Sequence, residues 1–207
     1  MSTRTLIDLL RAKLDPVEGE DARPRRGDND LNDVTFPERT LRPAAVLAPL
    51  VLHDGPPRFI LTLRADHLPS HAGQVSFPGG RAMPGETLPQ AALRETHEEI
   101  GITPDRIDLV GRFDSYETVT GFHVTPFVGI VKPGFTMLPD PGEVADVFET
   151  PFDWLMDAAN HETHEREFQG RMRRYYAMPW EGRYIWGATA GMLRALHERL
   201  YDEPCSD

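Results

Sequence analysis

The chain has 207 residues, of which 40% are hydrophobic and 27% charged, with a formal net charge of −11 at pH 7. This composition is ordinary for one medium-sized globular domain, and the absence of a basic stripe argues against a nucleic-acid polymer as the main partner. The single cysteine, Cys205, excludes an intramolecular disulfide, no run approaches the roughly 20 apolar residues of a membrane span, and no signal peptide is evident, so we expect a cytoplasmic protein.

The N-terminal region predicts a short helix followed by a charged connection. Leucines recur in helical phase between residues 5 and 14, at Leu6, Leu9, Leu10 and Leu14. Residues 15–33 are charged and poor in apolar side chains, as in a loop or a partly disordered link, and the Arg23-Pro24-Arg25-Arg26 cluster within them is expected to be solvated. We therefore divide the chain into a helix with a charged, partly flexible segment (1–35), a main domain (36–202) and a tail (203–207).

The main domain combines apolar runs of strand length with helical patterns. The runs span residues 44–52, 59–63, 107–113 and 122–131, and an aromatic strand is expected around Tyr175-Tyr176. Pro49 should disturb the first run or place it at a sheet edge, because proline cannot donate a ladder hydrogen bond. A short helix is predicted over residues 151–159 and a longer one over residues 188–200. These patterns alone indicate mixed α and β structure.

A further helix is predicted over residues 88–100. Thr87 is suited to the N-cap position, and Gln90 three residues later completes a capping-box pattern. Gly101 stands where helices commonly end. The inner face is expected to carry Ala92, Leu93, Thr96 and Ile100.

Three glutamates lie on one other face of this helix, at Glu95, Glu98 and Glu99. Positions i, i+3 and i+4 project to the same side, and like charges placed there repel by roughly 0.2–0.5 kcal/mol per pair. A solvated acidic face is the ordinary interpretation of such a cluster. Hard divalent cations take carboxylate oxygens as ligands, so a metal site is the alternative, and the flanking residues favour it.

These flanks form one spaced unit: Gly80, five residues, Glu86, seven residues, and then the run from Arg94 to Ile102. The segment resembles the Nudix box, G-x5-E-x7-R-E-U-x-E-E-x-G-U, in which U is a bulky apolar residue. Every fixed position matches, and Thr96 is the one departure at a U position. The resemblance implies the α/β/α sandwich of Nudix proteins, built on a mixed β-sheet.

Nudix proteins typically hydrolyse a nucleoside diphosphate linked to another group, and the resemblance implies Mg2+ or Mn2+ as cofactor. It implies metal ligation by Glu95, Glu98, Glu99 and the carbonyl of Gly79. It assigns Arg94 and Glu86 to a supporting pair that orients the glutamates. The catalytic base stays open between Glu143, in a turn-rich stretch where a mobile loop could lie, and Glu98 or Glu99.

A second motif precedes the box. Residues 60–65 and 73–80 resemble the signature of the coenzyme A pyrophosphatase branch, L-L-T-x-R-S/A-x3-R-x3-G-x-V-x-F-P-G-G. The clear departure is Pro69 where the pattern has arginine, whose planar fork suits a phosphate; His67 or His71 could compensate in part. The resemblance assigns substrate binding to Arg64, Gly73, Gln74 and Phe77.

The leading hypothesis is metal-dependent hydrolysis of the pyrophosphate in coenzyme A or its acyl or oxidised derivatives, giving 3',5'-ADP and 4'-phosphopantetheine or its acylated form. The second hypothesis is a Nudix pyrophosphatase that acts on ADP-ribose, a dinucleotide or an oxidised nucleotide. The third hypothesis is a nucleotide sensor without hydrolytic activity. The expected partner is a small nucleotide, neither a nucleic acid nor a membrane. The choice between a monomer and a homodimer stays open.

Two histidines outside these motifs have a spacing that zinc sites sometimes use. No cysteine or other clustered ligand accompanies His161 and His164. We therefore expect a surface helix end there.

Overall fold

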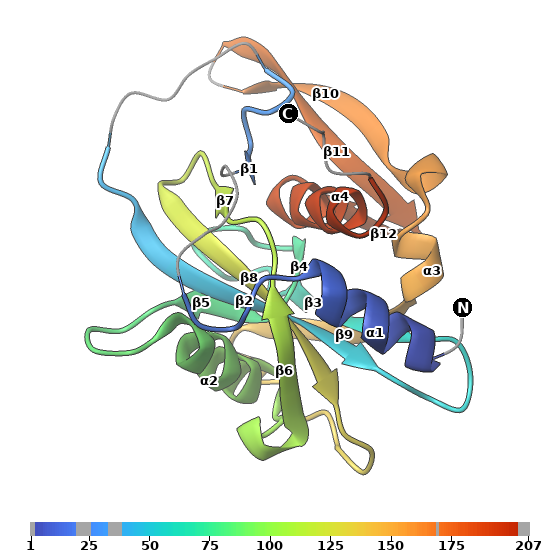
Figure 1. Cartoon of the computed structure of the whole chain (residues 1–207). Helices are drawn as coiled ribbons and strands as arrows, with labels where there is room; N and C mark the ends of the chain where they lie inside the picture. Colours follow the sequence, from blue (N-terminus) through green and yellow to red (C-terminus); the bar gives the residue numbers. More distant parts are fainter. Residues whose placement is uncertain (1–2, 20–25, 33–38, 169, 203–207) are drawn as a thin grey trace.

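A computed structural model of the protein describes residues 3–19, 26–32, 39–168 and 170–202 (Figure 1). The helices are α1 (Thr3–Lys13), α2 (Leu88–Ile100), α3 (Phe152–Leu155) and α4 (Ala188–Tyr201), with 3₁₀ turns η1 (Pro104–Arg106) and η2 (Ala158–Asn160). The strands are β1 (Arg26–Gly27), β2 (Arg42–Val51), β3 (Arg58–Arg64), β4 (Val75–Ser76), β5 (Gly79–Arg81), β6 (Ile107–Arg112), β7 (Tyr116–Glu117), β8 (Phe122–Val131), β9 (Val144–Pro151), β10 (Glu162–Phe168), β11 (Arg171–Trp180) and β12 (Arg183–Trp186). Within these ranges, no helix has both the length and the apolar character that crossing a membrane requires.

Two stretches named from the sequence fall outside the description. They are the tail with Cys205 and most of the arginine cluster at 23–26, of which only Arg26 is described. Arg26 is not simply solvated, because it pairs with Asp30 at 2.8 Å and with Glu198 of α4 at 2.6 Å.

Nine of the described strands form one mixed sheet. β2 and β8 run parallel and pair along their whole length, from Arg42 opposite Phe122 to Val51 opposite Val131. On its other side β2 pairs antiparallel with β5 and then with β3, and β3 pairs antiparallel with β9. A separate antiparallel sheet has the order β10-β11-β12. This topology brings the glycine-rich strand β5 next to the centre of the large sheet.

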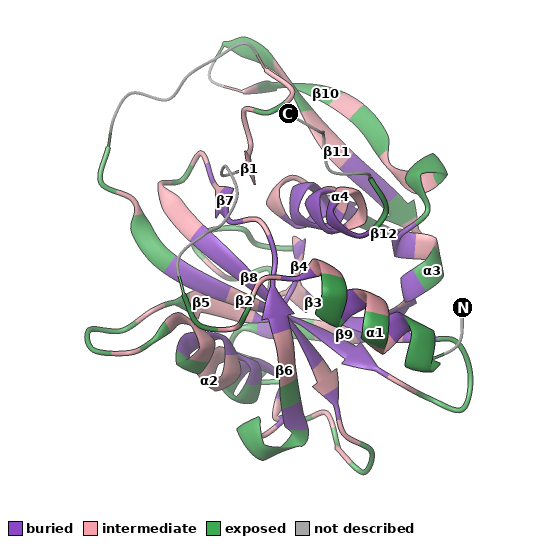
Figure 2. Ribbon diagram, viewed as in Figure 1, coloured by how far each residue is buried: buried purple, intermediate pink, exposed green. Residues whose placement is uncertain are grey.

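The side chains of β2 alternate between two cores. Ala44, Ala48 and Leu50 belong to the core that α1 and α4 cover. Ala45 and Leu47 point the other way, into the core beneath α2. Buried residues therefore line both faces of the sheet (Figure 2). These layers confirm the α/β/α sandwich with a mixed sheet, and they place α2 on the face opposite α4.

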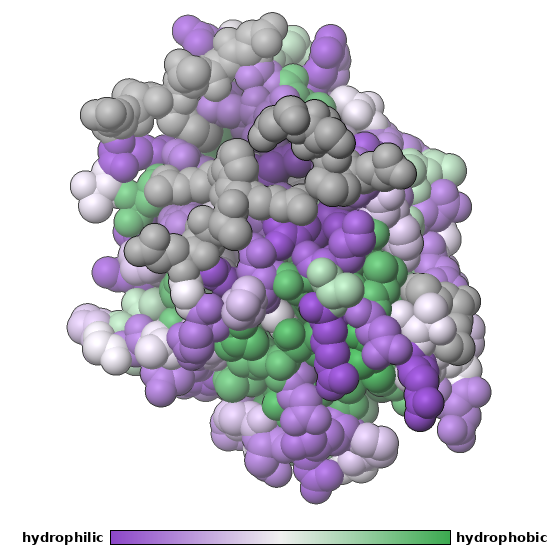
Figure 3. Space-filling view, viewed as in Figure 1, coloured by the Kyte–Doolittle hydropathy of each residue, from purple (hydrophilic) through white to green (hydrophobic). Residues whose placement is uncertain are grey.

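α1 packs onto the main core through its leucines. Leu6 and Leu10 are 1% and 0% exposed, and the buried Arg199 of α4 donates to the carbonyl of Lys13 at 2.6 Å. The same guanidinium pairs with Asp15 and Asp114. In the space-filling view, hydrophobic residues gather around α1 and β6, flanked by hydrophilic ones (Figure 3). The end of α1 is thus tied to α4 by one buried arginine.

The expectation for Pro49 is wrong, because β2 is a central strand with Pro49 opposite Gly129 of β8. The N–H of Leu47, two residues earlier, lies on the same side of β2 as the nitrogen of Pro49. It donates to the carbonyl of Pro78 at 2.9 Å. Pro49 falls between the residues of β2 that pair with β5 and those that pair with β3. The proline therefore sits where β2 changes partners, and its missing donor interrupts no ladder.

The region after β9 also differs from expectation. The single helix predicted over 151–159 is the short α3 followed by the turn η2. The expected helix end is met by His161, which is the C-cap residue of η2, but it is wrong for His164, which lies within β10. β10 is a strand despite its charged sequence because all seven of its residues pair with β11. The other predicted strands, 59–63, 107–113 and 122–131, and the terminal helix are confirmed as β3, β6, β8 and α4.

Candidate active site

The helix α2 begins and ends where its sequence predicts. The Gln90 N–H donates to the Thr87 hydroxyl at 3.4 Å, and the Thr87 N–H donates to the Gln90 side chain at 3.0 Å, which completes the capping box. At the other end Gly101 adopts the left-handed conformation with φ of 77°. These caps fix the rotation of the helix, and with it the directions of its glutamates.

The face of α2 that packs on the sheet includes a carboxylate. Thr96 is buried and donates its hydroxyl to the Ala92 carbonyl at 2.7 Å, so a threonine fits where the motif has an apolar residue. Glu99 is only 2% exposed. The expectation that all three glutamates point away from the interior is therefore wrong for Glu99.

The two glycines of β5, Gly79 and Gly80, leave room for the helix. A Cβ on Gly80 would lie 2.6 Å from Cδ of Glu95, and a Cβ on Gly79 would lie 2.4 Å from the carbonyl oxygen of Ala45. Both distances are far below van der Waals contact. Glycine is therefore required twice, once so that β5 can approach β2 and once so that the Glu95 carboxylate can lie against β5.

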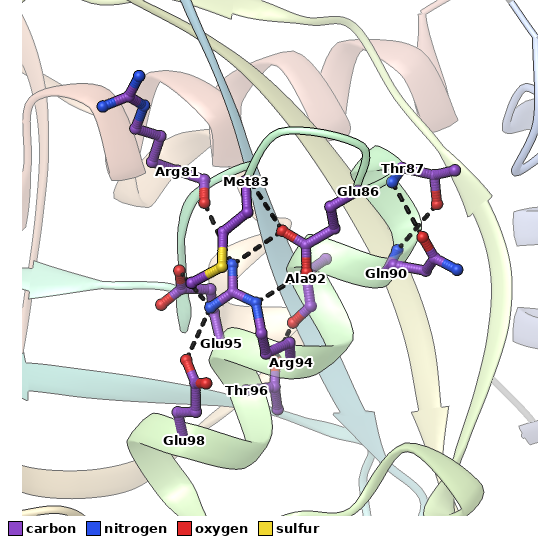
Figure 4. A network of polar contacts seen from close by, with 10 residues as sticks. All are labelled: Arg81, Met83, Glu86, Thr87, Gln90, Ala92, Arg94, Glu95, Thr96 and Glu98. Carbon is purple, nitrogen blue, oxygen red and sulfur yellow. Dashed lines mark hydrogen bonds and ion pairs between the residues drawn. The ribbon is translucent and has the colours of Figure 1, made fainter.

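Arg94 organises the outer carboxylates of α2 (Figure 4). Its Nε and Nη2 donate to the two oxygens of Glu86 at 2.7 and 3.0 Å, as a bidentate pair. Its Nη1 donates to Glu95 at 2.9 Å and to Glu98 at 2.7 Å, and its Nη2 also donates to the Arg81 carbonyl at 3.2 Å. Arg94 lowers the pKa of the Glu86 carboxyl below its usual range. One guanidinium thus positions three carboxylates and the loop before α2.

Glu99 is held on the inner side of the same helix. Its carboxylate accepts a hydrogen bond from the N–H of Gly79 at 3.2 Å and lies 3.5 Å from Nη1 of Arg64. Burial raises the pKa of Glu99 to about 8, and the charges of Glu95 and Glu143 act in the same direction. Arg64, expected to bind substrate, therefore faces Glu99, while its buried Nε has no hydrogen-bond partner among the described residues.

Glu143 comes from a distant part of the chain, and its charge contributes to the raised pKa of both Glu95 and Glu99. Its loop is tied down on both sides. The Asp140 N–H donates to the Glu99 carbonyl at 3.0 Å, and the Ala65 N–H donates to the Glu143 carbonyl at 2.9 Å. The stretch predicted as a mobile loop is therefore hydrogen-bonded to the end of α2 and to the end of β3.

The loop between β3 and β4 holds the remaining predicted substrate-binding residues. Gly73 has φ of +66° and donates to the Arg64 carbonyl at 3.1 Å, and Gln74 is bonded to Nδ1 of His71 at 2.9 Å. Phe77 is 1% exposed and packs edge-to-face on Phe59. The expectation that Phe77 binds substrate is therefore corrected. Phe77 is a core residue, and its ring lies behind the site.

Two contacts of this site were not predicted from the sequence. His67, suggested from the sequence only as a partial substitute for the missing arginine, bonds through Nε2 to the carbonyl of Gly142 at 3.0 Å. The Asp140 side chain accepts from the Gly142 N–H at 2.8 Å. The Asp-Pro-Gly run is a recognised turn sequence and could have predicted the second contact, whereas nothing local predicts the first.

The described residues contain no group of three or more His, Cys, Asp or Glu side chains arranged to hold a metal ion. Arg94 and Arg64 each hold part of the carboxylate set. The donors nevertheless fit a hard divalent cation, because burial together with mutual repulsion raises the pKa of Glu95 and Glu99. Such a concentration of carboxylate oxygens, only partly compensated by the two arginines, is the environment that Mg2+ or Mn2+ would relieve.

Comparisons with known proteins agree with this architecture. Residues 41–171, more than half of the chain, match the NUDIX domain. Over 174 residues the chain is 36% identical to the uncharacterised Nudix hydrolase NudL of Yersinia pestis (strain Pestoides F), and to that of Yersinia pseudotuberculosis (serotype O:1b, strain IP 31758), with 84% of this chain and 87% of each relative covered. The crystal structure of the Nudix hydrolase RenU from M. smegmatis has the same fold, with a TM-score of 0.53 at 18% identity over 80% of this chain and 89% of that one.

The capped acidic helix, the paired glycines and the α/β/α sandwich together define a Nudix domain. The chain belongs to the Nudix hydrolase family. It is an enzyme of that family, and its substrate is a question for the residues around the site.

Proposed function

We propose that the protein hydrolyses the pyrophosphate of coenzyme A or its derivatives, releasing 3',5'-ADP and 4'-phosphopantetheine or its acylated form. The observation that carries the proposal is the contact of Arg64 with Glu99. It joins the upstream coenzyme A motif to the glutamates of the Nudix box, so the two motifs form one site. β3, the loop that follows it and β5 all border the carboxylates. This arrangement is expected if the upstream motif determines which substrate is hydrolysed.

A divalent cation, Mg2+ or Mn2+, is part of the proposal. We assign its ligation to Glu95, Glu98, Glu99 and the carbonyl of Gly79. When bound, such an ion neutralises pyrophosphate charge and lowers the pKa of a bound water. The chain's own part is positional: Arg94 restrains the outer glutamates, and the N–H of Gly79 holds Glu99.

We assign to Glu143 the role of accepting the proton of the attacking water, because contacts with arginines engage the other carboxylates. Glu95 and Glu98 are engaged by Arg94, and Glu99 is engaged by Arg64 and Gly79. Glu143 is exposed, and none of the ion pairs described above includes its side chain. A general base needs a free lone pair facing the water, so we assign this role to Glu143, with the water oxygen attacking phosphorus as the bridging P–O bond breaks.

The alternative substrate class, ADP-ribose or a dinucleotide, is favoured by Pro69. The proline is exposed in the β3–β4 loop and supplies no charge where the coenzyme A motif has arginine. Arg64 is then the arginine that this motif retains, and its partly exposed guanidinium is a candidate donor for a phosphate oxygen.

The test is steady-state hydrolysis of coenzyme A, ADP-ribose and a dinucleoside polyphosphate by the purified protein with Mg2+ or Mn2+, with products resolved by chromatography. Release of 3',5'-ADP at a kcat/KM well above that of both comparators is expected. Faster turnover of either comparator would reject coenzyme A as the substrate. Glu98→Gln serves as the catalytic control, because it should abolish turnover while the circular dichroism spectrum is unchanged.

A further inference from the structure

The peptide unit that joins Gly142 to Glu143 is held at both of its polar ends. Its carbonyl accepts from Nε2 of His67 at 3.0 Å. Its N–H, that of Glu143, donates to the carbonyl of Asp140 at 3.0 Å. Because a peptide unit is planar, two such contacts on opposite sides fix its orientation, and with it the direction in which the Glu143 side chain leaves the backbone.

The loop that carries His67 is itself braced. The Arg64 N–H donates to the Gln74 carbonyl at 3.0 Å, and the Gly73 N–H donates to the Arg64 carbonyl at 3.1 Å. A Cβ on Gly73 would lie 3.0 Å from the Asp66 carboxylate, so the turn closes tightly behind His67. The imidazole of His67 therefore extends from a hydrogen-bonded loop to the loop that carries Glu143.

We propose that His67 is a positioning residue that sets the orientation of Glu143 through the Gly142 carbonyl. A carbonyl oxygen only accepts, so Nε2 carries the hydrogen and donates it. His67 lies outside both sequence motifs' fixed positions, and its role is a second support for the loop beside the contact between Ala65 and Glu143. The proposal rests on the proposed function through the assignment of Glu143 as the base.

The kinetic test is a double-mutant cycle of His67→Ala and Glu143→Gln, measured with whichever pyrophosphate substrate the wild type turns over. His67→Ala should lower kcat about three- to tenfold with KM unchanged, because one neutral hydrogen bond is lost and the base is less well oriented. In the Glu143→Gln background the same change should have no further effect on kcat. His67→Gln, which retains an N–H donor, should recover part of the loss.

His197→Ala is the matched control. His197 makes the same kind of contact, from Nδ1 to the Met156 carbonyl at 2.9 Å, on α4 away from the site. It should leave kcat unchanged even if the protein is less stable. An equal loss of kcat in both backgrounds of the cycle, or a loss confined to KM, would overturn the proposal, since His67 would then act independently of Glu143 or on substrate binding.

Hydrogen–deuterium exchange gives a readout that does not depend on activity. His67→Ala should increase exchange in residues 138–145, and His197→Ala should not. Unchanged exchange in this segment would reject the positioning role. If the wild type hydrolyses none of the substrates tested, the proposed function fails, while the exchange result still decides whether His67 holds the loop.

Discussion

Replacing Gly80 with alanine should separate activity from stability at this site. The new Cβ would lie 2.6 Å from Cδ of Glu95 and 2.7 Å from its Oε1. Carbon contacts are comfortable at roughly 3.5–4.0 Å, so the carboxylate must retreat by about 1 Å. The atom in the way is the end of a flexible side chain, and the cost in unfolding free energy should stay near 1 kcal/mol or less, about the worth of the weakened contact with Arg94.

The effect on catalysis should be much larger. A displacement of about 1 Å in a catalytic constellation can cost on the order of a hundredfold in rate. We therefore expect Gly80→Ala to lower kcat by about that factor and to raise the Mg2+ concentration needed for half-maximal rate, measured by steady-state kinetics over a metal titration. Urea denaturation of the same sample supplies the stability.

Two further glycines provide the comparison. A Cβ on Gly79 would meet backbone, at 2.4 Å from the Ala45 carbonyl oxygen and 2.6 Å from Cα of Val46, and backbone cannot move aside cheaply. Gly79→Ala should therefore cost about 1–3 kcal/mol of stability or more. A Cβ on Gly55 has nothing within 4 Å, so Gly55→Ala should be neutral in both assays. Activity of Gly80→Ala within about threefold of wild type at unchanged stability would refute the assigned role of Glu95 in the site.

Three other changes test contacts described above. Arg94→Lys keeps the charge but cannot bond Glu86 in bidentate fashion, so kcat should fall by about tenfold or more in the hydrolysis assay, and an unchanged kcat would contradict the orienting role. Arg199→Met removes a buried guanidinium that pairs with Asp15 and Asp114 and donates to the Lys13 carbonyl, and it should lower the unfolding free energy by about 3 kcal/mol in urea, with KM unaffected. Burial lowers the pKa of His161 below its usual value of 6.5, so the unfolded chain takes up the proton first. Its contribution to stability is therefore complete above about pH 6.5 and is lost as the pH falls below it; His161→Gln should flatten that part of the stability curve, and an identical curve would reject the assignment.

The parts of the site that the sequence predicted are those that depend on neighbours along the chain. The limits of α2 follow from Thr87, Gln90 and Gly101, which act within one turn of the helix ends. The spacing of Glu95, Glu98 and Glu99 then determines their directions. Motif spacing and helix geometry are local properties, so the folded structure shows them as the sequence predicts.

What the sequence did not predict depends on contacts between distant segments. Glu99 is buried because α2 lies on the face where β3 presents Arg64, and Phe77 is buried because Phe59 lies beneath it. Pro49 could be central because the pairing of β2 with β5 stops at Val46 and its pairing with β3 starts only at Leu50. Strand pairing and burial of this kind are set by the tertiary structure, which overrides local preference.

β10 shows how the small sheet ends. Within the described residues it pairs only with β11, which leaves its outer edge open. Residues facing each other in an antiparallel pair must both point their N–H and C=O groups toward the partner or both away. Two β10 strands from different molecules could pair antiparallel along all seven residues in one register. In that register Glu165 faces its own copy and His164 faces Arg166. This charge pattern discourages strand addition between molecules, and replacing Glu165 with valine would expose an edge on which further chains could assemble.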